Sequence, residues 1–261
     1  MNPVLIAVIV LGAVALVCGL LLVMASHFMA VPVDEKFLAL REVLPGANCG
    51  GCGYPGCDGY AKALADGREE KTNKCSAGGN EVAEKLAAAC GKSFEEAEKR
   101  VAFVQCRGEI GLTEKKDEYQ GTKSCQAARL LFGGDGACQY GCLGYGDCAA
   151  ICPQGAISLI KGVARVNPER CIACGQCLGA CPQRIIALIP FNAPVKVACS
   201  NKEKGAVARK KCSGACIGCS LCARNCPAEA IQVEGNLARV NYERCEGCGA
   251  CQGACPQKCI L

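Results

Sequence analysis

The chain has 261 residues, of which 27 are cysteine, and it carries a formal net charge of +5 with no tryptophan and 5% aromatic residues. Cysteines in this odd number, spread over a chain of this length, exclude a small secreted disulfide scaffold, which would be shorter and would pair its thiols. They require a reducing compartment, in which thiols stay free to bind metal. Because aromatic residues are so few, conventional cores must be small, and bound clusters must stabilise much of the fold.

The first predicted element is an apolar helix. The stretch from Pro3 to Ala25, PVLIAVIVLGAVALVCGLLLVMA, has no charged residue and is long enough to cross a bilayer. A cleaved signal peptide would have Lys or Arg before a shorter apolar core, and a buried helix of a soluble protein is rarely so apolar. The first basic residues, Lys36 and Arg41, follow the span. The positive-inside rule then predicts a single-pass protein of the cell (inner) membrane with its soluble part in the cytoplasm.

A glycine-rich cysteine segment comes next, NCGGCGYPGCDGYAKALADGREEKTNKC. Its cysteines follow the spacing Cys-x2-Cys-x4-Cys-x17-Cys and are Cys49, Cys52, Cys57 and Cys75. Glycines between the first three let the backbone curl around a metal cluster where β-carbons would obstruct it. We predict one iron–sulfur cluster on these four thiolates, with zinc as the alternative, because this spacing is less diagnostic than a ferredoxin run. Residues 58–67 predict a short helix that begins on an Asp cap and ends at Gly.

The following stretch contains no ligand motif. Residues 81–100, rich in Ala, Glu and Lys, predict two short helices broken at Gly91. Cys90 ends the first helix without a cysteine nearby, so we interpret it as a structural thiol. VAFVQC (101–106) predicts a buried strand, and the polar residues 108–123 predict a loop.

From residue 138 onward the chain repeats itself at an offset of 74 residues. ARVNPERCIACGQCLGACPQ returns as ARVNYERCEGCGACQGACPQ, and each copy has a predicted hairpin, AISLIKGVARV or AIQVEGNLARV. The runs that begin at Cys171 and Cys245 have the spacing Cys-x2-Cys-x2-Cys-x3-Cys-Pro. That spacing directs three thiolates to one four-iron cluster and the fourth to a neighbouring cluster. A zinc site would need two knuckles separated by a dozen or more residues.

This pattern resembles the two-cluster bacterial ferredoxin, used twice. The resemblance implies cross-ligation within each copy. In the second copy it implies one cluster on Cys216, Cys219, Cys222 and Cys255, and another on Cys245, Cys248, Cys251 and Cys226. In the first copy it implies one cluster on Cys171, Cys174, Cys177 and Cys152.

The remaining cluster of the first copy departs from the pattern. At the 74-residue offset Cys219 corresponds to Tyr145, so CQYGCLGYGDC lacks the middle cysteine. Cys138 begins this stretch, shortly before Cys142, and can replace the missing cysteine. We therefore predict a cluster on Cys138, Cys142, Cys148 and Cys181, with a three-iron cluster or none as the alternative.

The prediction is thus five [4Fe–4S] clusters. Four spare cysteines, Cys106, Cys125, Cys199 and Cys212, can hold a sixth; buried inert thiols are the simpler interpretation, because cysteine packs well beside strands. Five oxidised clusters contribute about −10 to the charge, so the loaded protein is acidic. The positive formal charge is therefore no argument for nucleic acid, and no basic helix interleaved with aromatic residues supports such a partner.

One further segment, and one missing motif, bear on partners. NKEKGAVARKK (201–211) carries five basic residues against one acidic residue. A solvated loop is the ordinary interpretation of this run, and a docking patch for an anionic electron carrier is the other. The chain has no phosphate-cradling glycine loop between a strand and a helix, so we expect no nucleotide or flavin site and only single-electron transfer.

Taken in order, the apolar span, CGGCGYPGC and YGCLGYGDCAAICP resemble the B subunit of Rnf complexes, the membrane-bound, ion-translocating ferredoxin:NAD oxidoreductases. The resemblance implies an electron-transfer subunit without a catalytic site of its own. Its partners would be soluble ferredoxin and the other membrane and peripheral subunits, which hold flavin and NAD. The usual family member carries one ferredoxin-like pair and this chain carries two, so the order of electron entry and exit stays open.

Two alternatives compete with this resemblance. One is a membrane-anchored polyferredoxin that serves another dehydrogenase or hydrogenase. The other is a corrinoid methyl-transfer subunit. CGGCGYPGC resembles the cluster loop of such subunits, although no barrel for a corrinoid follows it.

The predicted fold class is α+β, with a single transmembrane helix, a small helical cluster-binding domain and two tandem ferredoxin-like two-cluster units. The predicted divisions are 1–28 (membrane anchor), 29–100 (four-cysteine domain), 101–135 (linker with a strand and loop), 136–190 (first ferredoxin-like unit), 191–211 (basic linker) and 212–261 (second ferredoxin-like unit).

Overall fold

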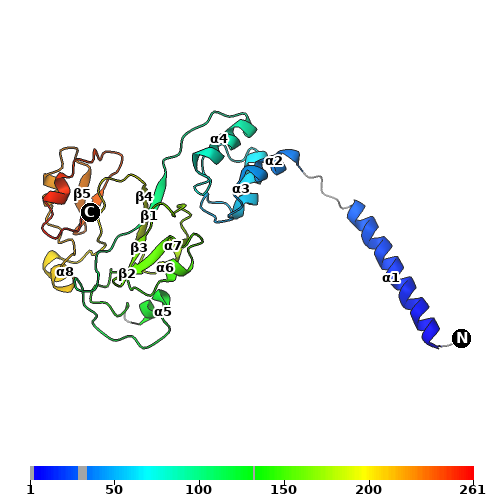
Figure 1. The fold of residues 1–261 in the computed structure, drawn as a ribbon, viewed down its shortest axis with the longest axis horizontal. Helices are drawn as coiled ribbons and strands as arrows, with labels where there is room; N and C mark the ends of the chain where they lie inside the picture. Colours follow the sequence, from blue (N-terminus) through cyan, green and yellow to red (C-terminus); the bar gives the residue numbers. More distant parts are fainter. Residues whose placement is uncertain (1–2, 29–33, 132) are drawn as a thin grey trace.

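The computed structural model describes residues 3–28, 34–131 and 133–261 (Figure 1). Its helices are α1 (Pro3–Phe28), α2 (Glu35–Val43), α3 (Gly56–Ala65), α4 (Gly79–Cys90), α5 (Cys125–Leu130), α6 (Asp147–Ala150), α7 (Gln176–Ala180), α8 (Gly205–Lys211), α9 (Leu221–Arg224) and α10 (Ala250–Gly253). Its strands are β1 (Arg100–Val104), β2 (Ile157–Ile160), β3 (Val163–Val166), β4 (Ile186–Pro190), β5 (Ile231–Glu234) and β6 (Leu237–Val240).

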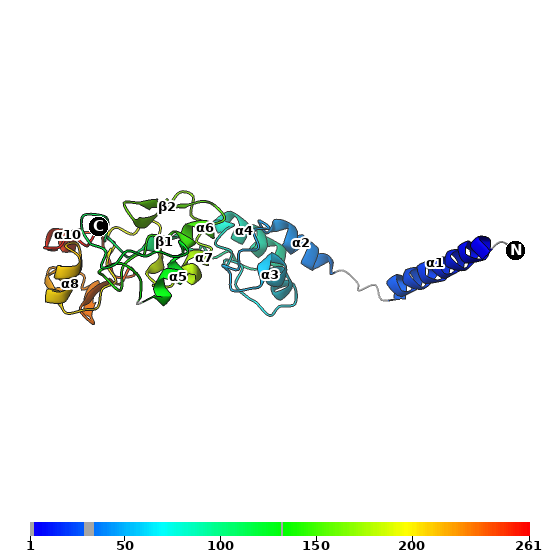
Figure 2. The ribbon, with the colours of Figure 1, turned by 90° about the horizontal axis from the view of Figure 1, so that it is seen from below.

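Helix α1 is the apolar N-terminal element. Its stretch Ile9–Ser26 has a mean hydropathy of 2.7, and none of it is buried. Figures 1 and 2 show α1 standing apart from the cysteine-bearing part of the chain. By length and composition this helix can cross a membrane.

Helices α2, α3 and α4 enclose a small core around Leu40, Tyr60 and Leu86. Helix α3 begins two residues before the predicted Asp58, directly after Pro55, and ends at Ala65. Helix α4 ends as predicted, because Gly91 adopts a left-handed conformation with φ of 65°.

The second helix predicted in residues 81–100 does not form. Residues 92–99 form no regular secondary structure in spite of their helix-forming composition. The Ala97 N–H donates to the Asn80 side chain at 3.0 Å, and the Lys92 ammonium donates to the Glu70 carbonyl at 3.0 Å. These tertiary hydrogen bonds outweigh a weak local propensity.

The first copy of the repeat (136–190) contains the predicted hairpin, β2–β3, in which Ile157 pairs with Val166. Strand β1 comes from outside the copy and pairs antiparallel with β4, with Val101 opposite Ile189. Buried residues of β1, β3 and β4 share one core with the cysteines of this copy. The strand predicted in the 101–135 linker is therefore part of the first copy's sheet.

The second copy (212–261) repeats this plan. Its predicted hairpin is β5–β6, with Ile231 opposite Val240. The segment before the copy again adds to it, because the Lys196 N–H donates to the Leu261 carbonyl and the Ala198 N–H to the Cys259 carbonyl, both at 2.8 Å. Each copy thus gains a short extended partner from the chain that precedes it.

Backbone contacts join the two copies. The Ser213 N–H donates to the Leu112 carbonyl at 2.8 Å, and Thr113 forms an antiparallel bridge with Cys212. The Ser200 hydroxyl donates to the Gln105 carbonyl at 2.9 Å. The segments before each copy therefore meet at the junction between them.

Candidate metal centres

Five cavities of about 310 to 430 Å³ in the described part of the chain are lined by at least four cysteines each. Within residues 3–28, 34–131 and 133–261, no three His, Cys, Asp or Glu side chains converge closely enough to hold one metal ion. Four thiols around one cavity match the number of protein ligands of a four-iron cluster.

The N-terminal domain brings its four predicted ligands to one cavity, which is lined by Cys49, Cys52, Cys57 and Cys75. The loop before α3 is fixed by Asn48, whose side-chain oxygen accepts the Cys57 N–H at 2.8 Å. Gly56 is required beside it, since its φ is 86° and an added β-carbon would lie 3.0 Å from that oxygen.

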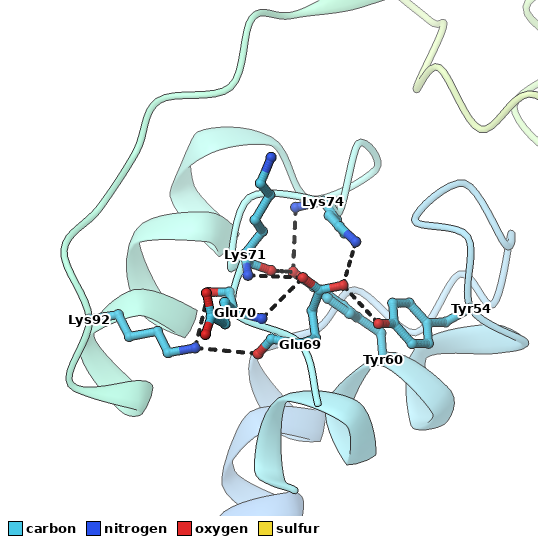
Figure 3. Close-up of polar contacts among 7 residues, drawn as sticks. All are labelled: Tyr54, Tyr60, Glu69, Glu70, Lys71, Lys74 and Lys92. Atoms are coloured by element: carbon cyan, nitrogen blue, oxygen red, sulfur yellow. Dashed lines mark hydrogen bonds and ion pairs between the residues drawn. The ribbon is translucent and has the colours of Figure 1, made fainter. Parts of the chain in front are cut away.

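A buried carboxylate fixes the segment that leads to Cys75 (Figure 3). Glu69 accepts hydrogen bonds from the Tyr54 hydroxyl at 2.7 Å and the Lys71 N–H at 3.0 Å, and it forms an ion pair with Lys74. The Lys74 ammonium, with these donors, lowers the pKa of Glu69 to about 2. The Tyr60 hydroxyl donates to the Lys71 carbonyl at 2.7 Å, so the same segment is tied to α3.

The first copy brings together one complete predicted set, Cys152, Cys171, Cys174 and Cys177, around a cavity of about 360 Å³. Two of these sulfurs accept backbone N–H groups: Cys152 from Ala156 at 3.3 Å, and Cys171 from Ala102 of β1 at 3.4 Å. This cavity adjoins the N-terminal domain, because a β-carbon added to Gly51 would lie 3.2 Å from the Cys174 α-carbon.

The other set of the first copy differs from the prediction. Its cavity is lined by Cys125, Cys142, Cys148 and Cys181, and Cys138 lines a different cavity. Cys125 is the first residue of α5, and Asp147 holds it there by accepting the Cys125 N–H at 2.9 Å. Asp147 precedes Cys148, so one carboxylate links the two cysteines.

Tyr145 corresponds in the repeat to the missing cysteine, but its side chain does not line the cavity. Its hydroxyl donates to Asp135 at 2.8 Å, and its ring packs edge-on against Tyr119 with centroids 5.5 Å apart. Cys125 therefore supplies the fourth thiol of this cavity, and Cys138, which the sequence suggested, does not.

In the second copy, one cavity contains the predicted Cys216, Cys219, Cys222 and Cys255 together with Cys259. The Cys259 sulfur lies 3.6 Å from that of Cys255, and Cys259 is 1% exposed. Sequence reasoning missed it, because its position in the first copy is held by Ile185 and no motif includes it.

The last predicted set is Cys226, Cys245, Cys248 and Cys251. Burial raises the pKa of the Cys251 thiol, and the neighbouring Cys226 and Cys245 add to this effect. The Cys226 sulfur accepts the Ala230 N–H at 3.3 Å, as Cys152 does from Ala156 in the first copy. Cys248 is exposed.

The fifth cavity holds three of the four spare cysteines. Cys106, Cys199 and Cys212 line it with Cys138, and Cys125 is absent from its wall. The repeat offset offered a signal for the place of Cys138, which corresponds to Cys212 at 74 residues. Hence Cys125 lines the cavity predicted for Cys138, and Cys138 lines the cavity of the spare cysteines.

Family models match three parts of the chain. The model described as "Putative Fe-S cluster" matches residues 44–76. The model described as "4Fe-4S binding domain" matches residues 164–187, and "4Fe-4S dicluster domain" matches residues 208–256. These matches include most of the cysteines in the cavities described above, and they favour iron–sulfur chemistry over zinc.

Two relatives with established names match the whole chain, and a third matches part of it. The B subunit of the Na⁺-translocating ferredoxin:NAD⁺ oxidoreductase complex of Acetobacterium woodii is 40% identical, over 100% of this chain and 78% of that protein. The B subunit of the ion-translocating oxidoreductase complex of Methanosarcina acetivorans is also 40% identical, over 100% of this chain and 99% of that protein. The corresponding protein of Shewanella loihica is 41% identical, over 44% of this chain and 63% of that protein. With full-length identity at this level, the chain belongs to the family of B subunits of Rnf-type ion-translocating ferredoxin:NAD oxidoreductase complexes.

Proposed function

We propose that this chain is an iron–sulfur electron-transfer subunit of an Rnf-type complex, with [4Fe–4S] clusters on its cysteine sets and no catalytic substrate site of its own. The observation that carries the proposal is the recurrence of four thiols around each of several similar cavities. When bound, such clusters accept and release single electrons.

The chain's own residues provide the thiolates and the backbone N–H groups that donate to them. Five sets are proposed: Cys49, Cys52, Cys57 and Cys75; Cys152, Cys171, Cys174 and Cys177; Cys125, Cys142, Cys148 and Cys181; Cys216, Cys219, Cys222 and Cys255; and Cys226, Cys245, Cys248 and Cys251. Backbone N–H groups that donate to the sulfurs of Cys152, Cys171 and Cys226 stabilise the charged thiolate form. Such donors are one of the means by which a protein sets cluster potentials.

The sites follow one another without large gaps. Gly51 packs against Cys174, which joins the N-terminal site to the first copy. Cys148 and Cys177 are buried in the same core, which joins the two sites of the first copy. This succession supports a relay along the chain rather than several independent centres.

Partners and membrane topology are the finer part of the proposal. The A. woodii relative is named for a complex with ferredoxin and NAD⁺ as substrates, so we propose soluble ferredoxin and the complex's other subunits as partners. Helix α1 would anchor the chain in the cell membrane in a single pass. The basic residues Lys36 and Arg41 after the span favour a cytoplasmic position for the cluster-bearing part.

Iron and acid-labile sulfide analysis of the anaerobically purified full-length chain tests this function. We expect about 20 or more iron atoms per chain and no stoichiometric zinc. Reduced ferredoxin should bleach the visible absorbance of the oxidised protein. Iron near about 12 per chain, or zinc in stoichiometric amount, contradicts the proposed ligand sets.

A single substitution provides a second test. Cys171→Ser should remove the cluster of its own set and lower the thermal stability of the first copy, because metal binding and folding are coupled in small metal domains. The matched control is Cys90→Ala, since Cys90 lines none of the five cysteine cavities. Equal iron content and equal stability in the Cys171 variant and the parent would remove Cys171 from the ligands.

A further inference from the structure

The cavity between the two copies is the feature that the five proposed sets leave unexplained. It has a volume of about 430 Å³ and is lined by Cys106, Cys138, Cys199 and Cys212, together with Cys142, which also lines the first copy's own cavity. Cys106, Cys199 and Cys212 are buried, with exposed fractions of 6%, 8% and 6%. Its volume is of the same order as the 310–370 Å³ of the cavities that carry proposed sets.

Backbone N–H groups converge on the sulfurs of this cavity. The Cys106 sulfur accepts the N–H groups of Gly108 and Cys142, both at 3.3 Å. The Cys199 sulfur accepts those of Asn201 at 3.5 Å and Cys216 at 3.2 Å. A neutral thiol is a weak acceptor, whereas a metal-bound thiolate carries charge and gains from such donors. Two donors on one sulfur therefore favour a ligand over an inert packing residue.

The cavity also follows the symmetry of the duplication. Cys138 and Cys212 are equivalent at the 74-residue offset, and so are Cys142 and Cys216, whose N–H groups donate to Cys106 and Cys199. Cys106 follows β1 and Cys199 follows the extended segment at 196–198, and these two elements make equivalent additions to the two copies. Each copy thus contributes one thiol from its own residues and one from the segment that precedes it.

The fourth sulfur has a side-chain donor. The Asn201 amide nitrogen lies 3.3 Å from the Cys138 sulfur, and Asn201 is 1% exposed. The same residue donates its N–H to Cys199. One buried residue therefore donates to two of the four thiols, through its side chain to Cys138 and through its backbone N–H to Cys199.

From this geometry we propose that Cys106, Cys138, Cys199 and Cys212 bind a further [4Fe–4S] cluster, shared by the two copies and lying between their own sites. The site adds to the proposed function and is not required by it. It touches both neighbours through the backbone, at Cys142 on one side and Cys216 on the other. The two copies then form one continuous series of sites, and the cysteines that belong neither to it nor to the N-terminal set are Cys18, Cys90 and Cys259.

Cluster counting on the full-length chain tests the proposal directly. Native mass spectrometry of the parent, with iron and sulfide analysis, should give six clusters and about 24 iron atoms per chain. The double variant Cys106→Ala, Cys199→Ala removes two ligands of one site and should lower the count by about four. The Cys90→Ala variant should keep the parental count.

A triple variant tests the membership of Cys138. Adding Cys138→Ala to the double variant should cause no further loss of iron, because the three residues serve one site. Adding Cys125→Ala instead should lower the count by about four more, because Cys125 serves the first copy's own set. If Cys138 completed the set of Cys142, Cys148 and Cys181, these two results would be reversed.

Two outcomes overturn the proposal: a parent with five clusters and about 20 iron atoms, or a double variant with the parental count. Where a variant loses its fold, the cluster count of the parent decides alone. A parent with five clusters leaves the proposed function intact and removes only this site. Stoichiometric zinc, or iron near about 12, would remove both.

Discussion

Single side chains decide which thiol enters which site. Asp147 accepts N–H groups from Cys125 and Gln126 at 2.9 and 3.0 Å, and its contacts hold the start of α5 beside Cys148. Tyr145, which replaces a cysteine of the repeat, is held away by Asp135. These contacts cannot be inferred from the spacing of the cysteines. The exchange of Cys125 and Cys138 was therefore beyond prediction from the run alone.

Glu69 offers a test at this scale. Glu69→Gln should lower the thermal stability of the N-terminal domain by the equivalent of about 1–3 kcal/mol, because the buried donors around it lose a charged acceptor. The folded pKa of about 2 lies below the ordinary 4.5, so the carboxylate's contribution is complete above pH 4.5 and is lost as the pH falls toward 2. The difference in melting temperature between parent and variant should thus be constant from about pH 6 to 8.

The matched control for Glu69 is Glu81→Gln. Glu81 also pairs with a lysine, Lys85, but its side chain is 77% exposed. Solvent screens such a pair, so this variant should melt with the parent. Equal melting of the Glu69 variant and the parent would mean that the network in Figure 3 does not fix the Cys75 segment.

At the scale of elements, prediction succeeded where the signal is local. Both hairpins formed at the predicted residues, because an apolar run that turns at Lys161-Gly162 or at Gly235-Asn236 specifies its own pairing. It failed where tertiary contacts decide. Residues 92–99 have helical composition yet form no regular secondary structure, and the basic stretch 201–211 contains a helix, α8, instead of a continuous loop. Three basic residues in the last turn of α8 complement its C-terminal dipole.

Helix α8 lies in the basic run 201–211, for which a docking patch for an anionic electron carrier is one of the two interpretations. Lys202, Lys204, Arg209 and Lys210 are exposed, whereas Lys211 pairs with Glu203 at 2.5 Å. Ferredoxins that carry several clusters are anionic, so exposed cations should steer them toward the second copy. Reversal of Lys202, Arg209 and Lys210 to Glu should slow reduction by ferredoxin several-fold at low ionic strength. The difference should vanish at high salt, because steering is screened.

The control for this reversal changes charge equally at a distant site. Lys36, Lys62 and Lys85 are exposed on the helical N-terminal domain. Stopped-flow absorbance at low salt should show a smaller effect for their reversal to Glu than for the α8 variant. Equal rates for the α8 variant and the parent would mean that electrons enter elsewhere.

At the scale of the whole molecule, electron transfer between the N-terminal domain and the first copy requires that the two are in contact. Gly51 packs on the backbone of Cys174, and an added β-carbon would lie 3.2 and 3.3 Å from its α-carbon and carbonyl oxygen. Gly51→Val should therefore separate the N-terminal domain from the first copy. Iron content should stay at the parental value, while electron exchange between the two parts, followed by freeze-quench EPR, slows.

The control is Gly179→Ala, since a β-carbon at Gly179 meets nothing within 4 Å and the residue lies in α7. This variant should exchange electrons at the parental rate. An unchanged rate in Gly51→Val would indicate that electrons do not cross at this contact.

The exposed position of Cys248 has a consequence for the survival of the protein in air. Most of the other proposed ligands are buried or half-buried, but this thiol faces solvent at one end of the series. Oxygen and peroxide reach solvent-accessible sulfur first. Oxidative damage should therefore begin at the Cys245 set and spare the interior sites. A brief exposure to air would remove the cluster of that set before those of the buried sets.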